Sequence, residues 1–376
     1  MSFIEVKEVS KTFKVNKRSA GIPGMIANMF VPKFENKKAV DGISFDIESG
    51  EMVGFIGPNG AGKSTTIKML SGILCPDSGS ISVNSYVPYR QRKEYVAGIG
   101  VVFGQKSQLQ WDLPVIDSFE LLKAIYRIPE EMYKKNLKRY TDMLDMGGFI
   151  NQPVRQLSLG QRMRSDIVAS LLHSPKIVFF DEPTIGVDVI GKETIRSFIR
   201  ELNEKDKITM IFTTHDMQDI EQTCKRILII DKGSLLYDGS LQEIRNKYGT
   251  TRQLIAEFNE DTEVTPIENV MIGDPKDRKR SFIFDNSVVD VNALMHEILG
   301  KYSIRDITVT EPEIETIIRK YITKRYLHED DGLYGICQKE FFAKERIPHG
   351  TLDGNTEHAD KTCDLCGDIQ GIVWRS

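Results

Sequence analysis

Residues 57–65 read GPNGAGKST, and this stretch decides the fold of the chain. It fits the pattern G-x-x-x-x-G-K-[ST]. An apolar run, EMVGFIG at 51–57, leads into it, and a helix-like segment, KSTTIKMLSGIL, follows. A strand, a glycine-rich loop and a helix in this order make a phosphate site, because loop N–H groups and the helix dipole both attract anions. We interpret the stretch as a nucleotide phosphate loop rather than a chance glycine turn.

The residues of this loop have separate expected roles. Gly57, Gly60 and Gly62 let backbone N–H groups curl around the phosphates. Lys63 can reach the β- and γ-phosphates, and the Ser64 hydroxyl can bind Mg²⁺. The nucleotide-binding candidates are Gly57, Pro58, Asn59, Gly60, Ala61, Gly62, Lys63, Ser64 and Thr65.

A second segment, IVFFDE at 177–182, reads as a buried strand that ends in two acids. By itself such an ending is only a strand terminus. Beside a phosphate loop it gains a function, because phosphoryl transfer needs an acid for the metal and a group that positions water. We expect Asp181 to hold Mg²⁺ through water and Glu182 to orient and polarise the attacking water.

Two further polar residues follow strand-like runs. Gln105 comes after IGVVF at 99–103, and His215 comes after ITMIFTT at 208–214. Polar residues at strand ends are usually ordinary loop residues. Here all the candidates lie at strand ends of one expected sheet, where open α/β folds bind their ligands. We expect Gln105 to complete the Mg²⁺ shell and His215 to contact the γ-phosphate and hold the water.

Strand-like and helix-like segments alternate along most of the chain, which predicts a mostly parallel sheet in an α/β fold. The run from Trp111 to Phe149 lacks strand signals and is expected to be a helical insertion. After Tyr248 a short series of strands and helices indicates a small separate α/β unit. We expect a main domain at 1–248 with a helical subdomain at about 111–165, an accessory domain at 249–322, and a tail at 323–376.

The composition narrows the class of protein. The chain has 376 residues, with 50 basic and 54 acidic side chains, so it lacks the basic excess of nucleic-acid-binding proteins. It has no apolar run of about 18 residues that would cross a membrane, and its N-terminus lacks a signal-peptide core. The single, scattered Cys75 and Cys224 suggest a reducing, cytoplasmic compartment.

A second anion-binding turn is predicted far from the phosphate loop, where residues 157–164 read LSLGQRMR. Ser158 and Gly160 stand beside a helix start, so a hydroxyl and N–H groups are available for a phosphate. The alternative is a plain serine N-cap for the following helix. Both can hold, because capping and anion binding use the same end of the helix.

The order of these motifs resembles the ABC-type ATPases: GPNGAGKST, Gln105, LSLGQ, IVFFDE, the acid Asp188 of PTIGVD, and His215. The resemblance covers residues 1 to about 245. It implies a P-loop NTPase fold of the ABC type, with a RecA-like core sheet, an antiparallel β-subdomain and a helical subdomain. It also implies ATP and Mg²⁺ as ligands, and adenine stacking on an aromatic residue, which Phe13 matches in position.

Within this family the chain is most similar to nucleotide-binding subunits of exporter-type transporters with separate permeases, in a subgroup with LSLGQRMR as its signature. The resemblance implies a cytoplasmic protein held at the inner face of the membrane by permease subunits that face the Gln105 segment and helical insertion. It implies a dimer of two copies, or of this chain with a similar paralogue. The residues expected to contact the partner's ATP are Ser158, Leu159, Gly160, Gln161 and Asp188. Leu159 replaces a glycine of the commoner LSGGQ, which leaves the local loop conformation open.

Two other functions are alternatives for a chain with these motifs. A soluble ABC-type protein acting on translation or DNA would carry two nucleotide domains with a basic linker, or long coiled coils, and this sequence has neither. An inactive regulatory copy would lack catalytic groups, yet Lys63, Asp181, Glu182 and His215 are all present. No nucleic-acid partner is expected.

Two segments keep open alternatives. The insert at 14–38 carries the apolar residues Ile26, Met29, Phe30 and Val31, and is either an amphipathic element at the permease or lipid surface or a loop folded on its own domain. The tail carries Cys337, Cys363 and Cys366, which fit no standard zinc spacing, so it is either a metal site or a flexible end.

Overall fold

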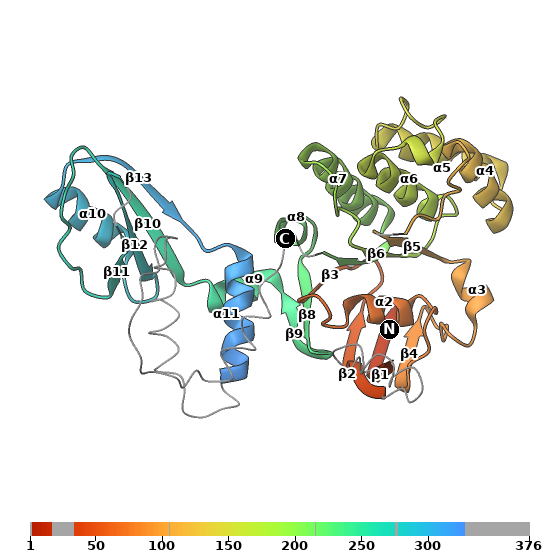
Figure 1. Ribbon diagram of the computed structural model, residues 1–376, viewed down its shortest axis with the longest axis horizontal. Coiled ribbons are helices and arrows are strands. Elements are labelled where there is room, and N and C mark those ends of the chain that lie inside the picture. Colours follow the sequence, from red (N-terminus) through yellow and green to blue (C-terminus); the bar gives the residue numbers. More distant parts are fainter. Residues whose placement is uncertain (1, 17–33, 105, 215, 275–276, 328–376) are drawn as a thin grey trace, which may run out of the picture. The chain divides into compact units, whose positions relative to one another are not determined.

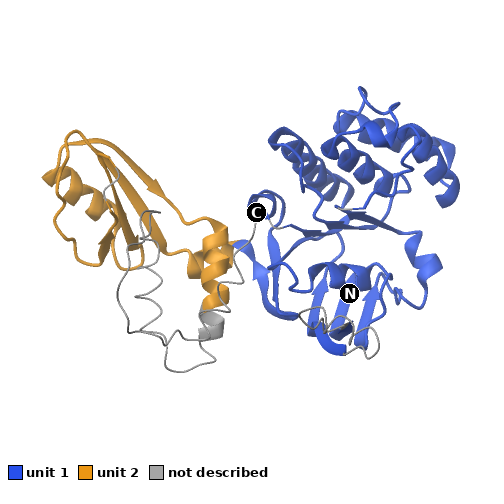
Figure 2. Cartoon of the chain, in the orientation of Figure 1, with its two compact units in different colours: residues 1–241 blue, residues 242–376 orange. Residues whose placement is uncertain are grey.

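A computed structural model describes residues 2–16, 34–104, 106–214, 216–274 and 277–327. The chain divides into two compact units, residues 1–241 and 242–376 (Figure 2). The division falls at the start of helix α9 (Leu241–Tyr248). The insert residues Ile26, Met29, Phe30 and Val31, the cysteines of the tail, and the predicted site residues Gln105 and His215 lie outside the described residues.

The core of unit 1 is a six-stranded sheet with the order β5-β6-β7-β3-β8-β9 (Figure 1). All its neighbouring strands are parallel except β8 and β9. The strands are β3 (Met52–Ile56), β5 (Ile99–Phe103), β6 (Ile177–Asp181), β7 (Thr209–Thr213), β8 (Arg226–Asp231) and β9 (Ser234–Ser240). Strands covered on both faces read as continuous apolar runs, which is why IVFF and MIF could be recognised. The predicted mostly parallel α/β sheet is confirmed.

A second, antiparallel sheet of unit 1 has the order β2-β1-β4. It consists of β1 (Ile4–Asn16), β2 (Phe34–Ile47) and β4 (Ser78–Val83). The β1–β2 pairing runs from Ile4↔Ile47 out to Asn16↔Phe34, so both ends of the 14–38 insert extend this hairpin. Buried side chains of both sheets form one apolar cluster, in which the Phe45 and Phe55 rings lie 6.2 Å apart. The expected β-subdomain is therefore present.

The helices of unit 1 cover the sheets and form one lobe. They are α2 (Lys63–Leu70), α3 (Arg92–Val96), α4 (Val115–Tyr126), α5 (Glu130–Met143), α6 (Leu159–Leu171), α7 (Val189–Asp206) and α8 (Met217–Thr223). Helix α2 contacts both β2 and β6, and so lies between the two sheets (Figure 1). Helices α4, α5 and α6, with a 3-10 turn at Val154–Gln156, pack as a lobe beyond β5 and supply the expected helical insertion.

In its described residues, unit 2 has a four-stranded antiparallel sheet with the order β11-β12-β10-β13 and three helices. Its elements are α9, β10 (Thr251–Phe258), β11 (Val270–Ile272), β12 (Lys279–Asp285), α10 (Val291–Lys301), β13 (Ile304–Thr310) and α11 (Ile314–Leu327). Alternate residues of β10, Leu254, Ala256 and Phe258, are buried against α10 residues such as Leu294. None of the helices in the described part of the chain is long and apolar enough to span a membrane.

Candidate nucleotide site

The phosphate loop lies between the end of β3 and the first residue of α2, and its glycines are required by their surroundings. A Cβ on Gly57 would overlap the carbonyl oxygen of Ile230. Gly62 has φ +114°, and a Cβ there would lie 2.5 Å from the carbonyl oxygen of Ala39. Because both positions are closed to larger residues, the neighbouring strands and loops fix the path of the loop.

Lys63 is buried within this loop, with 5% of its side chain exposed. Its Nζ donates to the carbonyl oxygen of Gly57 at 2.7 Å and to that of Pro58 at 3.2 Å. Burial lowers the pKa of Lys63, while the charges of Glu182 and Asp181 act in the opposite direction. The ammonium group is thus held at the loop by weak neutral acceptors that a phosphate, as a stronger charged acceptor, can replace.

Side-chain oxygen atoms from α2, β6 and β7 lie together at this end of the sheet. The Ser64 hydroxyl at the start of α2 donates to Asp181 Oδ1 at 3.2 Å, and Thr213 at the end of β7 donates to the same oxygen at 2.7 Å. A carboxylate and a hydroxyl are the hard ligands that Mg²⁺ prefers, so these groups fit that ion. Thr213 was not predicted from the sequence, although its place at a strand end next to Asp181 was a usable signal.

Glu182 leaves the end of β6 with φ +57°, a left-handed conformation that is uncommon outside glycine. Its N–H donates to the carbonyl oxygen of Thr213 at 3.0 Å, which holds the turn against β7. Strained backbone of this kind gathers at functional sites.

Gly104 packs against the same turn and was missed by the sequence reasoning. Its N–H donates to the carbonyl oxygen of Asp181 at 2.8 Å, and a Cβ there would overlap the carbonyl oxygen of Glu182. The structure therefore brings the residue before Gln105 directly onto the acidic turn. A glycine at the end of a strand, next to a polar residue, was the available signal.

A buried carboxylate, Asp219 on α8, ties together two loops of the site. Its oxygens accept hydrogen bonds from the Thr184 hydroxyl, from the Thr214 hydroxyl at 3.0 Å and from Arg196 Nε at 2.6 Å. Thr184 lies two residues after Glu182, and Thr214 directly precedes His215. Asp219 is fully buried, and burying a carboxylate is unfavourable unless it is paired. The ion pair with Arg196 and the two hydroxyl hydrogen bonds offset that cost.

Phe13 lies on β1 with 37% of its side chain exposed, and Lys11 Nζ is 5.8 Å from the centre of its ring. An aromatic ring with an accessible face can stack on a nucleobase. Its adenine contact stays a prediction.

The signature turn, residues 157–161, is capped within its own chain. Gln161 N–H donates to Ser158 Oγ at 3.2 Å, and Ser158 N–H donates to Gln161 Oε1 at 2.9 Å, so the pair forms a reciprocal capping box. The side chain of Leu159 is packed against Gly186, which has φ +66°. Asp188 caps α7 by accepting from Gly191 N–H at 2.6 Å. In the described residues these contacts stay among the turn, α6 and the start of α7.

Comparison with known proteins agrees with this geometry. A family model described as "ABC transporter" matches residues 40–185. The ABC transporter ATP-binding protein NatA of Bacillus subtilis (strain 168) is 32% identical over 216 residues, which cover 56% of this chain and 87% of NatA. The chain belongs to the ABC transporter ATP-binding proteins. The linearmycin resistance ATP-binding protein LnrL of the same organism is 33% identical over 216 residues, covering 57% of this chain and 69% of LnrL.

Solved structures of ABC proteins have the same fold. The dimeric structure of MJ0796, a bacterial ABC transporter cassette, superimposes with a TM-score of 0.54 at 27% identity, covering 63% of this chain and 98% of the cassette. This chain is accordingly an ABC-type ATPase, and the expected core sheet, β-subdomain and helical subdomain are confirmed. The roles assigned above to individual site residues remain predictions.

Proposed function

We propose that this chain hydrolyses ATP to drive transport, in the export direction, through a separate membrane permease. The observation that carries the proposal is the cluster formed by Lys63, Ser64 and Asp181 beside the strained turn at Glu182. It combines a buried cation, the oxygen atoms of Ser64 and Asp181, which suit a metal ion, and the carboxylate of Glu182, all at one end of a parallel sheet. These are the groups that phosphoryl transfer to water requires.

In this proposal each group has one task. Lys63 and the loop N–H groups hold the β- and γ-phosphates, and Phe13 stacks on the adenine. Ser64, Asp181 and Gln105 would hold Mg²⁺, which when bound neutralises charge on the phosphates. Glu182 orients and polarises the water, and His215 contacts the γ-phosphate. The buried bonds of Asp219 to Thr184 and Thr214 fix the loops on which Glu182 and His215 are carried.

The proposal includes a sandwich of two copies of the ATPase domain, or of this chain with a similar paralogue. Ser158, Leu159, Gly160, Gln161 and Asp188 would then contact the partner's ATP. Support comes from the contacts of these residues, which in the described part of the chain lie within α6 and with Gly186 and the start of α7. The similarity to a cassette solved as a dimer, and in another structure as a dimer with ADP and Pi, also supports it.

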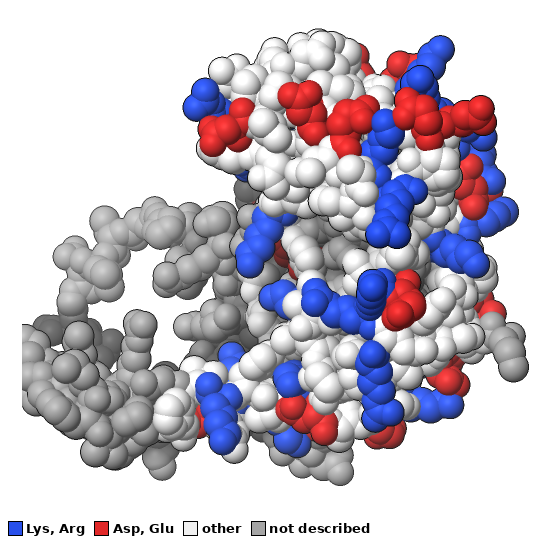
Figure 3. Space-filling model, turned by 90° about the vertical axis from the view of Figure 1, so that its right-hand side faces the viewer, with Lys and Arg blue, Asp and Glu red and all other residues white. Residues whose placement is uncertain are grey.

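The permease is the proposed partner, which would hold the chain at the inner, cytoplasmic face of the membrane. Export is supported by the names of relatives, such as LnrL and the daunorubicin resistance ATP-binding protein DrrA3 of Streptomyces coeruleorubidus, 30% identical over 58% of this chain. Nucleic acid is not the proposed partner. Figure 3 shows acidic and basic side chains sharing one face of the molecule rather than a single basic field.

One experiment tests the transport role. A tagged full-length chain is purified from solubilised membranes, with a Lys63→Ala chain as the control for ATP dependence. We expect a multi-span membrane protein to co-purify with both chains, and vesicles holding the complex to move solute only with ATP and intact Lys63. Recovery of ribosomes or DNA in place of a membrane protein would refute the role, and ATP-driven uptake toward the ATPase side would refute export.

A further inference from the structure

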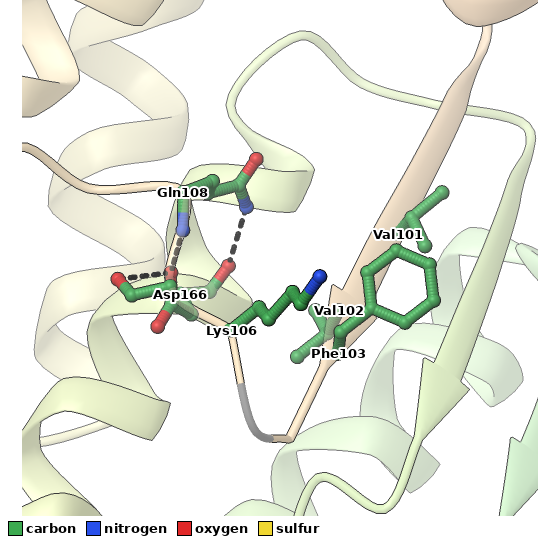
Figure 4. A pocket seen from close by; sticks show the side chains of 7 residues that line it. Val101, Val102, Phe103, Lys106, Gln108 and Asp166 are labelled. Atoms are coloured by element: carbon green, nitrogen blue, oxygen red, sulfur yellow. Dashed lines mark hydrogen bonds between the residues drawn. The ribbon is translucent and has the colours of Figure 1, made fainter. Parts of the chain in front are cut away.

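Unit 1 has a pocket of about 210 Å³ at the end of β5, and none of its lining residues belongs to the catalytic cluster (Figure 4). It is lined by residues of β5, by Lys106, Ser107 and Gln108, and by Asp166 of α6. The buried Asp166 carboxylate accepts hydrogen bonds from Ser107 Oγ at 2.9 Å and from Gln108 N–H at 3.0 Å. Burial raises the pKa of this carboxyl to about 6. The acid of this pocket is therefore bonded within its own chain.

A different set of polar groups lies on the β1–β2 hairpin, which adjoins the phosphate loop. Val40 of β2 belongs to the same apolar cluster as Ala61, and a Cβ on Gly62 would lie 3.3 Å from Val40 Cγ2. Lys11 of β1 is paired with Val40 across the hairpin. Because residues directly opposite each other share one face of a sheet, Lys11 and Val40 mark the hairpin face that adjoins the phosphate loop.

Phe13, the ring proposed to stack on the nucleobase, lies further along this face. It is two residues from Lys11 on β1, and alternate residues of a strand point to the same side. Lys11 Nζ lies 5.8 Å from the centre of the Phe13 ring, and an ion pair of 2.7 Å with Asp77 holds the ammonium group there. A base whose phosphates are bound at the loop is thus offered a ring on the adjoining face.

A β-bulge decides which residue of β2 faces Phe13. The pairing register of the hairpin shifts at Ala39, which is an extra residue on β2. After the shift Phe13 is paired with Lys37, whereas an unbroken register would place Lys38 there. The bulge therefore puts Lys37 on the same face as Phe13, with the two Cβ atoms about 5 Å apart.

Lys37 is available to a ligand at this position. Its side chain is exposed and forms no ion pair with any of the described residues. Lys38, on the other face of the hairpin, pairs with Asp41 at 3.1 Å. An ammonium group donates up to three hydrogen bonds and accepts none. Beside a stacking ring, such a group recognises acceptor atoms on the edge of a base.

Purine bases differ in the acceptors that they present. Stacking does not distinguish them, because every base has a π-face. Guanine has two adjacent acceptors, O6 and N7, whereas adenine has N7 next to an N6 amino group that donates. Lysine suits the guanine pair, and its contact with O6 and N7 is a common specific contact to that base. An ammonium group near N6 of adenine gains only the N7 acceptor.

We propose that Lys37 contacts the nucleobase and makes the site bind purines with an oxygen at position 6, as in GTP, more tightly than adenine. The inference rests on the proposed function, because it requires a base stacked on Phe13. ATP remains a substrate, since it shares the stacking and the phosphate contacts of the Lys63 loop. GTP becomes a second nucleotide that the chain binds and hydrolyses.

The test is a competition experiment against a fluorescent ATP analogue, with the full-length chain carrying Glu182→Gln so that nucleotides persist. ATP, GTP and ITP are the competitors, and ITP has the O6 and N7 atoms of GTP without its 2-amino group. Lys37→Ala is compared with Lys14→Ala as the matched control. Lys14 is another exposed lysine of the hairpin, paired with Asn36 on the opposite face from Phe13.

We expect GTP and ITP to bind the parent about tenfold more tightly than ATP, the scale of a good base contact. Lys37→Ala should bring the three affinities within about twofold of one another and leave that for ATP within about twofold of the parent value. Lys14→Ala should keep the parent preference. The same ratio of GTP to ATP affinity in the parent and in Lys37→Ala would overturn the base contact alone. A parent chain that binds none of the three nucleotides would overturn the proposed function itself.

Discussion

The phosphate loop and the signature turn are both anion-binding turns at helix starts, and this chain completes them differently. In the phosphate loop, Lys63 is buried and bonded, and neighbouring backbone closes around Gly57 and Gly62. In the signature turn, Ser158 caps α6 by exchanging hydrogen bonds with Gln161 of the same helix, and Leu159 is 36% exposed. Backbone from elsewhere in the chain encloses the first turn, whereas the second turn is closed by hydrogen bonds within its own helix.

The surroundings of the two turns sharpen this difference. Leu159 contacts Gly186, and a few residues later Val189 and Ile190 are 82% and 81% exposed at the start of α7. Adjacent exposed apolar side chains next to a polar turn are typical of surfaces that another protein covers. These exposed side chains support the proposal that a second copy contacts the signature turn.

The largest expected effect is on ATP turnover, and it comes from a change next to the phosphate loop. Glu182→Gln should lower steady ATP turnover by about 100-fold or more, because it removes the carboxylate proposed to position the water while leaving the phosphate contacts. ATP binding should persist, and ATP should then accumulate a dimer, measured by light scattering. A variant that remains monomeric at saturating ATP and Mg²⁺ would contradict the two-copy proposal.

A second effect concerns Leu159, which stands where the signature usually has a glycine, and its contact with Gly186. Gly186→Ala should lower the free energy of unfolding by about 2 kcal/mol, because its φ of +66° disfavours a side chain and the new Cβ would overlap Leu159. Adding Leu159→Gly should recover the part caused by the overlap and leave the backbone part. Urea unfolding of the single and double variants measures both terms. Additive losses would show that Leu159 and Gly186 do not interact.

A third, smaller effect is the pH dependence of stability at Asp166. Its folded-state pKa of about 6 lies above the ordinary value of 3.8, so the folded state binds more protons than the unfolded state between these pH values. The stability contributed by this group is therefore full below the unfolded pKa and is lost as the pH rises, by about 1 kcal/mol between pH 5 and pH 7. Asp166→Asn should lack this loss. The free energy of unfolding is measured for wild type and Asp166→Asn across this pH range. If their difference does not change with pH, Asp166 makes no pH-dependent contribution to stability.

The smallest expected effect, a factor of two, is at the signature turn. In mixed dimers of a Ser158→Ala chain and an intact chain, both also carrying Glu182→Gln, one ATP rather than two should stay bound per dimer. The matched control is Ser170→Ala, which removes a hydroxyl of the same helix that donates to the Ile167 carbonyl oxygen at 2.8 Å, away from the turn. Two retained ATP molecules in the Ser158→Ala mixture would place the nucleotide contact elsewhere.

Local motifs were sufficient for much of the site. The phosphate loop, the strand that ends in Asp181 and Glu182, and the serine cap at Ser158 could be predicted because each depends on neighbours within a few residues. The alternation of apolar strands with helices likewise predicted the parallel sheet, since buried strands read as continuous apolar runs. The individual roles of Phe13, Gln105, Asp188 and His215 remain predictions.

Groups that act across the chain could not be predicted in this way. Asp219 binds Thr184 over 35 residues, and Asp166 binds Ser107 over 59 residues. In the sequence these are ordinary polar residues on helix faces, because nothing local distinguishes a solvated carboxylate from a buried one. The sequence by itself determined the fold and the chemistry of the phosphate loop, through patterns with a period of two to four residues. Only the tertiary structure decided which polar groups lose water and bond to each other, because burial depends on elements that meet after the chain has folded.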